Sequence, residues 1–291
     1  MLKESVLKSR YPERFFSPFL YSQYVIVNGI RTRYSVSGLG EPILLLHGFP
    51  ENMQTWRHYA ILLSKHFKVI AFDLKGFGRT GKPDGDYSPF GMADFVRDFM
   101  DAMKIESAYL VGSDISFTIA CAFALRYPGR LKKLVLMAGT LSKEGIIAPE
   151  VKMLSLKPVG ELILWLFGSI AIKIGLEKGF YKKDYISKEV FDEYYEPYKD
   201  PVAIKRTLEL LRSFDKAGPE LVRQVKKIGV PTLILWAQHE RFFALQVAKN
   251  LNDGIKNSRM EIVEGCGHFI QEEKPEESAN LITSFVRQDA H

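Results

Sequence analysis

The chain has 291 residues and a mass of 33.2 kDa, enough to bury a substantial core without a stabilising disulfide or metal. Its 46% hydrophobic and 25% charged residues exclude a disordered, collagenous or coiled-coil protein. The only two cysteines, Cys121 and Cys266, exclude a disulfide framework and a cysteine-based zinc site. The net charge of +6 is scattered, and the basic runs at 130–133 and 223–227 accompany no nucleic-acid motif. We therefore expect no nucleic-acid partner.

The first residues, 1–15, interleave charged and apolar side chains and contain no continuous apolar run. This pattern is unlike a secretory signal, so we expect a reducing, cytoplasmic location.

In chain order, strand-like apolar runs alternate with helix-length stretches. Strands at 23–28 and 31–37 are predicted to form a hairpin around the turn Asn28-Gly29. The further expected elements are a strand at 43–46, a helix at 56–66, a strand at 68–72, a helix at 92–103, a strand at 108–111, a helix at 115–127, strands at 131–137, 232–236 and 260–263, and a helix at 275–286. This alternation predicts an α/β protein with a mostly parallel sheet covered by helices on both faces.

The alternation stops between about 141 and 227, where the pattern is helical without clear strands. We expect a core domain of residues 1–140 and 229–291, with residues 141–228 inserted as a helical lid over the carboxyl ends of the strands, where α/β proteins bind ligands. The most apolar stretch, 162–172, is too short to span a bilayer. It is interpreted as a lid core helix, an apolar ceiling over a pocket or a membrane-contacting helix, and no stable membrane insertion is expected.

Residues 111–116 (VGSDIS) join a predicted strand to a predicted helix, the context of a nucleophile elbow. Such a turn needs small residues two positions before and after the nucleophile. Only Asp114, between Gly112 and Ser116, meets this condition. The start of the following helix stabilises an ionised carboxylate, which attacks saturated carbon without needing a base.

The alkyl ester formed in that attack must then be hydrolysed, and this needs a positioned base. His268 follows the last predicted strand in the loop Cys266-Gly267-His268-Phe269. Glu240 follows the strand at 232–236 and is the natural acid to orient His268 and stabilise its imidazolium.

These residues, in this order, resemble the α/β-hydrolase superfamily over nearly the whole chain outside the lid. The matching segments are His47-Gly48-Phe49-Pro50 followed by Glu51 and Trp56-Arg57, the loop Asp73-Leu74-Lys75-Gly76-Phe77-Gly78, and Gly267-His268-Phe269 with Glu273, Pro275 and Glu276. The aspartate at the elbow is similar to the branch that holds epoxide hydrolases and haloalkane or fluoroacetate dehalogenases. The resemblance implies Asp114 as nucleophile, His268 as base, Glu240 as acid, and the backbone N–H groups of Phe49 and Ile115 as an oxyanion hole.

The resemblance is incomplete at several positions. Ile115 replaces the tryptophan that binds halide in haloalkane dehalogenases, and Ile115 with Thr118 replaces the paired arginines of fluoroacetate-type enzymes. Ser116, Ala237 and Glu240 also depart from the usual residues, which leaves room for altered or lost activity. Epoxide hydrolases need lid acids to protonate the ring oxygen, and the candidates here are Tyr181, Tyr185, Tyr194 and Asp215, with Tyr195 and Tyr198 as further lid tyrosines.

The expected activity is hydrolysis of an apolar epoxide to a diol through an ester on Asp114. The alternatives are dehalogenation or ester or lactone hydrolysis on the same scaffold, and a non-hydrolytic binding or biosynthetic role. The expected partner is a hydrophobic small molecule. We expect a monomer or homodimer, and no metal or organic cofactor, because the nucleophile, base and acid are all side chains.

Overall fold

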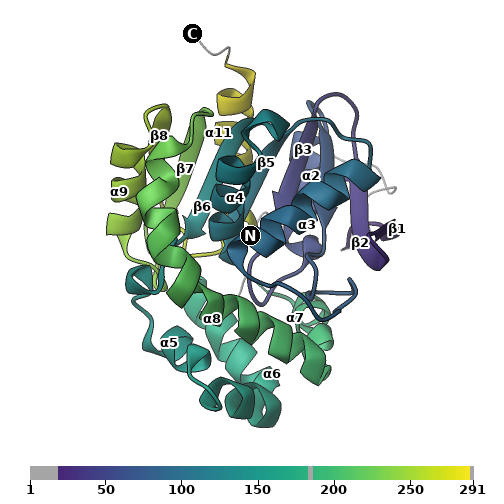
Figure 1. Ribbon diagram of the computed structural model, residues 1–291, viewed down its shortest axis with the longest axis vertical. Helices are drawn as coiled ribbons and strands as arrows, with labels where there is room; N and C mark the ends of the chain where they lie inside the picture. Colours follow the sequence, from purple (N-terminus) through teal and green to yellow (C-terminus); the bar gives the residue numbers. More distant parts are fainter. Residues whose placement is uncertain (1–18, 183–185, 289–291) are drawn as a thin grey trace.

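The computed structural model describes residues 19–182 and 186–288. A sheet with the strand order β1-β2-β4-β3-β5-β6-β7-β8 forms the centre of the molecule (Figure 1). The strands are β1 (Gln23–Val27), β2 (Ile30–Ser37), β3 (Pro42–Leu46), β4 (Lys68–Phe72), β5 (Ala108–Asp114), β6 (Leu131–Gly139), β7 (Thr232–Ala237) and β8 (Ser258–Val263). This mostly parallel sheet confirms the α/β architecture that the sequence predicts.

Antiparallel strand pairs occur only at the edge of the sheet that begins with β1. β1 and β2 form the predicted antiparallel hairpin, with Asn28 and Gly29 at positive φ in the turn, and β2 pairs antiparallel with β4. All remaining neighbours are parallel, so the carboxyl ends of β3 to β8 lie at the same edge of the sheet.

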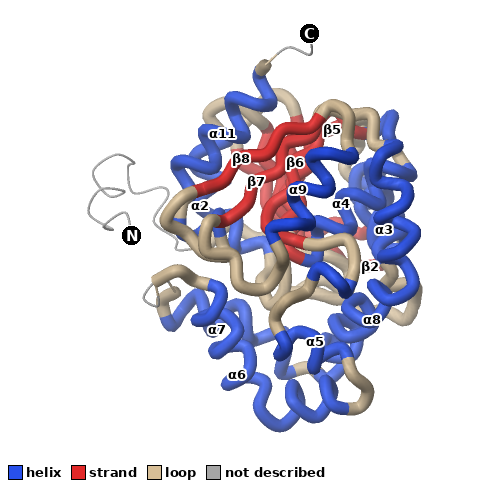
Figure 2. Tube along the Cα trace, turned by 90° about the vertical axis from the view of Figure 1, so that its left-hand side faces the viewer, coloured by secondary structure: helices blue, strands red, loops and turns tan. Residues whose placement is uncertain are grey.

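Helices cover both faces of the sheet. One face packs against α2 and α11, and the other against α3, α4 and α9, as Figures 1 and 2 show from two sides. The helices of this part are α2 (Arg57–Leu63), α3 (Pro89–Ala102), α4 (Ile115–Arg126), α9 (Leu245–Gly254), α10 (Ile270–Glu273) and α11 (Pro275–Arg287). Helix α9 was not predicted from the sequence, because only Ala248 and Leu251 bury apolar side chains in it.

A group of helices between β6 and β7 lies beyond the carboxyl ends of the strands (Figure 1). These lid helices are α5 (Pro149–Ser155), α6 (Val159–Gly179), α7 (Lys188–Tyr195) and α8 (Pro201–Gln224). No strand interrupts them in the described residues of this insertion. The lid therefore faces the edge of the sheet at which the loops with the candidate residues end.

Candidate active site

Asp114 is the last residue of β5 and the N-cap of α4, with φ of 56° and ψ of −119°. A side chain is rarely held in this conformation outside a functional turn. A Cβ at Gly112 would lie 2.4 Å from the Ser116 carbonyl oxygen, which is why only a small residue fits there. The hydroxyl of Ser116 donates to the His47 carbonyl oxygen, so the serine ties the elbow to the neighbouring loop.

The loop after β3 holds one oxygen of the Asp114 carboxylate. The Phe49 N–H donates to Asp114 Oδ1 at 2.8 Å. A Cβ on Gly48 would come within 2.6 Å of the Asp114 Cβ, so glycine is required for this approach. His47 braces the loop, because its Nδ1 contacts the Gly48 carbonyl and its Nε2 accepts from the Leu74 N–H. Burial lowers the pKa of His47, in keeping with a neutral structural ring.

The second oxygen of Asp114 faces the buried ring of His268. His268 Nε2 lies 3.3 Å from Asp114 Oδ2, and its Nδ1 lies 2.8 Å from Glu240 Oε2. The other Glu240 oxygen accepts from the Phe242 N–H at 2.7 Å. Burial opposes protonation of His268, but Glu240 and Asp114 together raise its pKa well above the ordinary value. The His268 ring thus lies between two carboxylates, each of which favours its protonated form.

A further buried carboxylate, that of Glu51, holds the loop after β3, which carries Phe49 and is called the oxyanion loop below. Glu51 accepts from the Gly48 N–H at 3.2 Å, from Gln271 Nε2 at 2.8 Å and from the Thr55 hydroxyl. Burial raises the pKa of Glu51 to about 7. Glu51 therefore links the loop that carries Phe49 to α10.

The lid candidates from the sequence occupy different environments. Tyr194 is buried and donates to Glu272, which is also held by Arg57 through two contacts of 2.5 and 2.6 Å. Tyr181 is partly exposed, and its ring stacks on His239 with 4.1 Å between the ring centroids. Tyr185 lies outside the described residues.

Asp215 is half exposed and lies 3.3 Å from Lys143 Nζ, with which it forms an ion pair. The structure thus gives Asp215 a surface partner instead of placing it beside Asp114.

Tyr198, which the sequence did not distinguish from other lid tyrosines, is buried beside the oxyanion loop. Its ring meets that of Phe49 edge to face, with 5.5 Å between the centroids. Burial raises the pKa of Tyr198 most, a hydrogen bond with the Thr207 hydroxyl lowers it, and the carboxylates of Asp114, Glu51 and Asp73 raise it further. Tyr198 is therefore a neutral, buried hydroxyl group that feels the charge of the Asp114 carboxylate.

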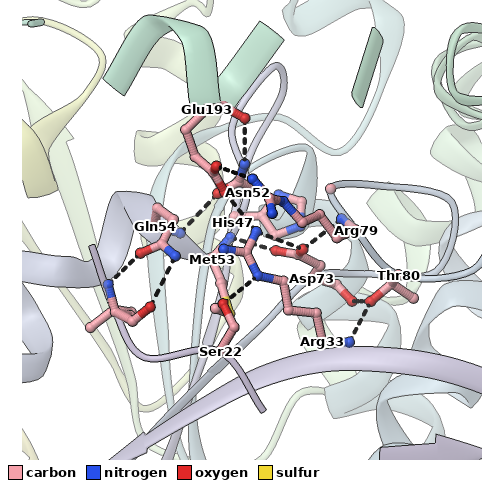
Figure 3. Close-up of polar contacts among 12 residues, drawn as sticks. Ser22, Arg33, His47, Asn52, Met53, Gln54, Asp73, Arg79, Thr80 and Glu193 are labelled. Atoms are coloured by element: carbon pink, nitrogen blue, oxygen red, sulfur yellow. Dashed lines mark hydrogen bonds and ion pairs between the residues drawn. The ribbon is translucent and has the colours of Figure 1, made fainter. Parts of the chain in front are cut away.

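A buried ionic network joins the lid to the core beside this site (Figure 3). Glu193 of α7 binds Arg33 Nη1 and Arg79 Nη2, each at 2.6 Å, and its carbonyl accepts from Asn52 Nδ2 at 3.1 Å. Arg33 also lies 3.6 Å from Asp73, whose carboxylate accepts from two backbone N–H groups. No sequence motif marks Glu193, because its partners are far away along the chain.

The same region contains an open surface cleft of about 650 Å³ between α7 and the loop around Arg79. Its lining is charged, and the catalytic candidates are not among its lining residues. Asp114 and His268 are themselves buried under the lid. Within residues 19–182 and 186–288, no group of three or more His, Cys, Asp or Glu side chains is arranged to hold a metal ion.

The chain belongs to the α/β-hydrolase fold family, whose model matches residues 41–275. It is 27% identical to a 2-hydroxy-6-oxo-6-(2'-aminophenyl)hexa-2,4-dienoic acid hydrolase of Metapseudomonas resinovorans, over 97% of this chain and 93% of the relative. It is also 27% identical to epoxide hydrolase 3 of Xenopus tropicalis, over 90% of this chain and 76% of the relative. The structure of Cfl2 from Burkholderia cenocepacia superposes with a TM-score of 0.85 at 22% identity, covering 96% of this chain and 99% of that one. Family membership supports a hydrolase.

Proposed function

We propose that the protein hydrolyses an epoxide on an apolar small molecule, through a covalent ester on Asp114, to give a diol. The observation that carries this proposal is the position of the two Asp114 carboxylate oxygens at the elbow. Phe49 holds Oδ1, while Oδ2 points to His268. A carboxylate at the elbow is suited to attack at saturated carbon, and the likeness to an epoxide hydrolase supports the same chemistry.

In the first step, Asp114 Oδ2 attacks one ring carbon, and the bond from that carbon to the ring oxygen breaks. The ring oxygen takes the proton of the buried Tyr198 hydroxyl, which lies beside Phe49 of the oxyanion loop and is influenced by the Asp114 charge. The products of this step are an alkyl ester on Asp114, a neighbouring hydroxyl group and a phenolate on Tyr198.

Ester formation then removes the negative charge of Asp114. Because that charge helps to raise the pKa of His268, its loss lowers the pKa, and the imidazolium proton returns to the Tyr198 phenolate through solvent. His268 thereby becomes a base only after the nucleophile has reacted.

In the second step, His268 takes a proton from water as the water oxygen attacks the Asp114 carboxyl carbon. The oxyanion develops on Oδ1, which already accepts from the Phe49 N–H. As the ester bond breaks, His268 protonates the departing alkoxide and the diol leaves. The proton on the regenerated carboxyl group then passes to His268, which restores the ion pair.

The experiment that tests the proposal is intact-protein mass spectrometry of His268→Gln incubated with an aryl epoxide, an alkyl epoxide and a chloroalkane. Without the base, alkylation proceeds and hydrolysis stops. We expect a mass increase equal to that of the epoxide, located on the peptide that contains Asp114 and absent from His268→Gln/Asp114→Ala.

Three other results would each replace the proposal by a different function. An adduct from the chloroalkane alone would replace the proposal by dehalogenation. Turnover of a chromogenic ester that survives Asp114→Ala would replace it by acyl chemistry. If folded His268→Gln forms no adduct and wild-type protein binds these compounds without turnover, the binding role replaces hydrolysis.

A further inference from the structure

Helix α6 presents an apolar face that nothing in the described residues covers. Residues spaced four apart along the helix are buried in the lid: Gly160, Leu164, Gly168, Ile172 and Leu176. The helix is kinked at Phe167, whose φ of −128° and ψ of 19° are not helical. Leu162, Leu166, Ile170 and Ile174 are offset from the buried row by two residues, about 200° around a regular helix, and Trp165 and Phe167 adjoin Leu166 in the sequence. All six of these large apolar side chains are exposed. We call these six residues the α6 face.

The α6 face exposes more apolar surface than a helix of this composition normally does. A helix that is apolar on all sides is normally buried, whereas only 28% of the most apolar window of α6 is buried. By length and composition, α6 also satisfies the criteria for a membrane-spanning helix. Its packed face, however, belongs to the lid, and the helix lies along the outer end of the molecule in both views (Figures 1 and 2). This position suits a helix that lies on a surface and does not cross it.

The charges around the α6 face favour one kind of partner. Residues 150–182 contain five lysines and three glutamates. Each glutamate forms an ion pair: Glu150 with Lys178, Glu161 with Arg212 and Glu177 with Lys173. Lys157 and Lys182, which flank the two ends of α6, are exposed. Lys157 helps to lower the pKa of Glu161, whose ion-pair partner is Arg212. An apolar helix face flanked by exposed lysines is complementary to an anionic lipid surface.

A second copy of the chain fits this face less well. In a twofold contact through α6, lysines of one copy would face lysines of the other, whether the helices ran parallel or antiparallel. Lipid phosphates instead attract the same lysines, and the exposed indole of Trp165 suits the boundary between headgroups and acyl chains.

We propose that the α6 face docks the protein on anionic membrane surfaces. The face lies close to the proposed chemistry, because the carbonyl of Gly179, the last residue of α6, accepts from the His268 N–H at 2.8 Å. The docking itself is independent of the reaction at Asp114, so either proposal can fail without the other.

Tryptophan fluorescence offers a direct test, because Trp56 and Trp236 are buried while Trp165 is 68% exposed. The protein is titrated with vesicles of phosphatidylcholine, with and without phosphatidylglycerol. We expect the emission to shift to the blue with anionic vesicles, to be quenched by brominated acyl chains, and to revert in high salt. Trp165→Phe should remove this signal while the protein still co-sediments with the vesicles.

Matched variants identify the face. Ile170→Ser should weaken vesicle binding about tenfold, because it removes a large apolar group from the bilayer contact. Ile262→Ser, a control on β8, should not change it; Ile170 is 58% exposed and Ile262 is 49% exposed. Lys157→Glu should weaken binding several-fold, and Lys256→Glu, on the exposed turn after α9, should not.

Three results would overturn the proposal. One is the absence of vesicle binding at low salt by protein that retains its native melting temperature. Another is an equal loss of binding in Ile170→Ser and Ile262→Ser. The third is a concentration-dependent dimer in sedimentation that Ile170→Ser abolishes, without vesicle binding, which would assign the α6 face to a second copy.

Discussion

The candidate active site and the lid helix α6 differ in how their side chains are surrounded. At the centre, both oxygens of Asp114 and both ring nitrogens of His268 have close partners, and all of these groups are buried. On α6, large apolar groups are exposed to solvent. Strand ends can hold charges because backbone N–H groups and neighbouring side chains satisfy them, whereas a lid helix has only one face to bury. Under the proposed function, the core therefore provides the nucleophile and the base, and the lid provides the proton donor and an outward surface.

The largest effect should come from the core. Asp114→Ala removes the nucleophile, and we expect epoxide turnover to fall by on the order of 10⁴-fold or more. The measurement is kcat/KM, with circular dichroism to verify the fold. Activity within tenfold of the wild type would contradict the assigned role of the elbow.

A smaller effect should come from the lid. Tyr198→Phe keeps the ring contact with Phe49 and removes only the hydroxyl, so alkylation of Asp114 should slow by about 10²-fold, the usual contribution of a general acid. The readout is the rate of adduct formation in His268→Gln, with and without Tyr198→Phe.

Tyr195→Phe is the matched control, because that ring stacks on Phe191, with 6.0 Å between the centroids. Equal alkylation rates in all three proteins would exclude Tyr198 as the donor and return the role to another lid residue.

The contact between the two regions depends on Glu193. Glu193→Ala leaves the buried Arg33 with the Ser22 hydroxyl and the more distant carboxylate of Asp73, and we expect the free energy of unfolding to fall by about 3 kcal/mol. Urea denaturation measures the change. Glu196→Ala, which breaks only the exposed pair with Lys199, should change it by less than about 0.5 kcal/mol. If Glu193→Ala and Glu196→Ala lowered the free energy of unfolding equally, the ion pairs of Glu193 would not stabilise the contact between lid and core.

The smallest expected effect is the change that the buried Glu51 causes in the stability of the protein as the pH rises. Its pKa in the folded protein, about 7, lies above its ordinary value of 4.5, so the folded state binds the proton more tightly than the unfolded state. The resulting stability is present in full below pH 4.5 and is lost as the pH rises through 7. Relative to Glu51→Gln, the wild type should therefore lose about 2 kcal/mol between pH 5 and pH 8.

The difference between the two proteins isolates Glu51, because the pKa values of Glu273 and His268 are also raised and act with the same sign in both. Parallel stability curves for wild type and Glu51→Gln would show that Glu51 does not titrate in this range.

Much of the fold was accessible from local sequence patterns. Apolar runs such as 43–46 and 68–72 are buried strands, and Asn28-Gly29 makes the predicted hairpin turn. Helix α9 was missed because its two buried residues give too weak a periodicity. Strand β5 extends beyond the predicted 108–111 to Asp114, because small residues continue it where apolar ones end.

The sequence by itself determined which residue types stand at the elbow and after the strands, because backbone geometry demands small residues beside a nucleophile and those constraints are local. Only the tertiary structure decided that Tyr198, among several lid tyrosines, buries its hydroxyl within the electrostatic influence of Asp114. It also decided that Glu193 pairs with Arg33 across the lid and the core, and which side chains of α6 remain exposed. These facts depend on contacts between segments far apart in the chain, and burial or pairing across such distances leaves no periodic trace in the sequence.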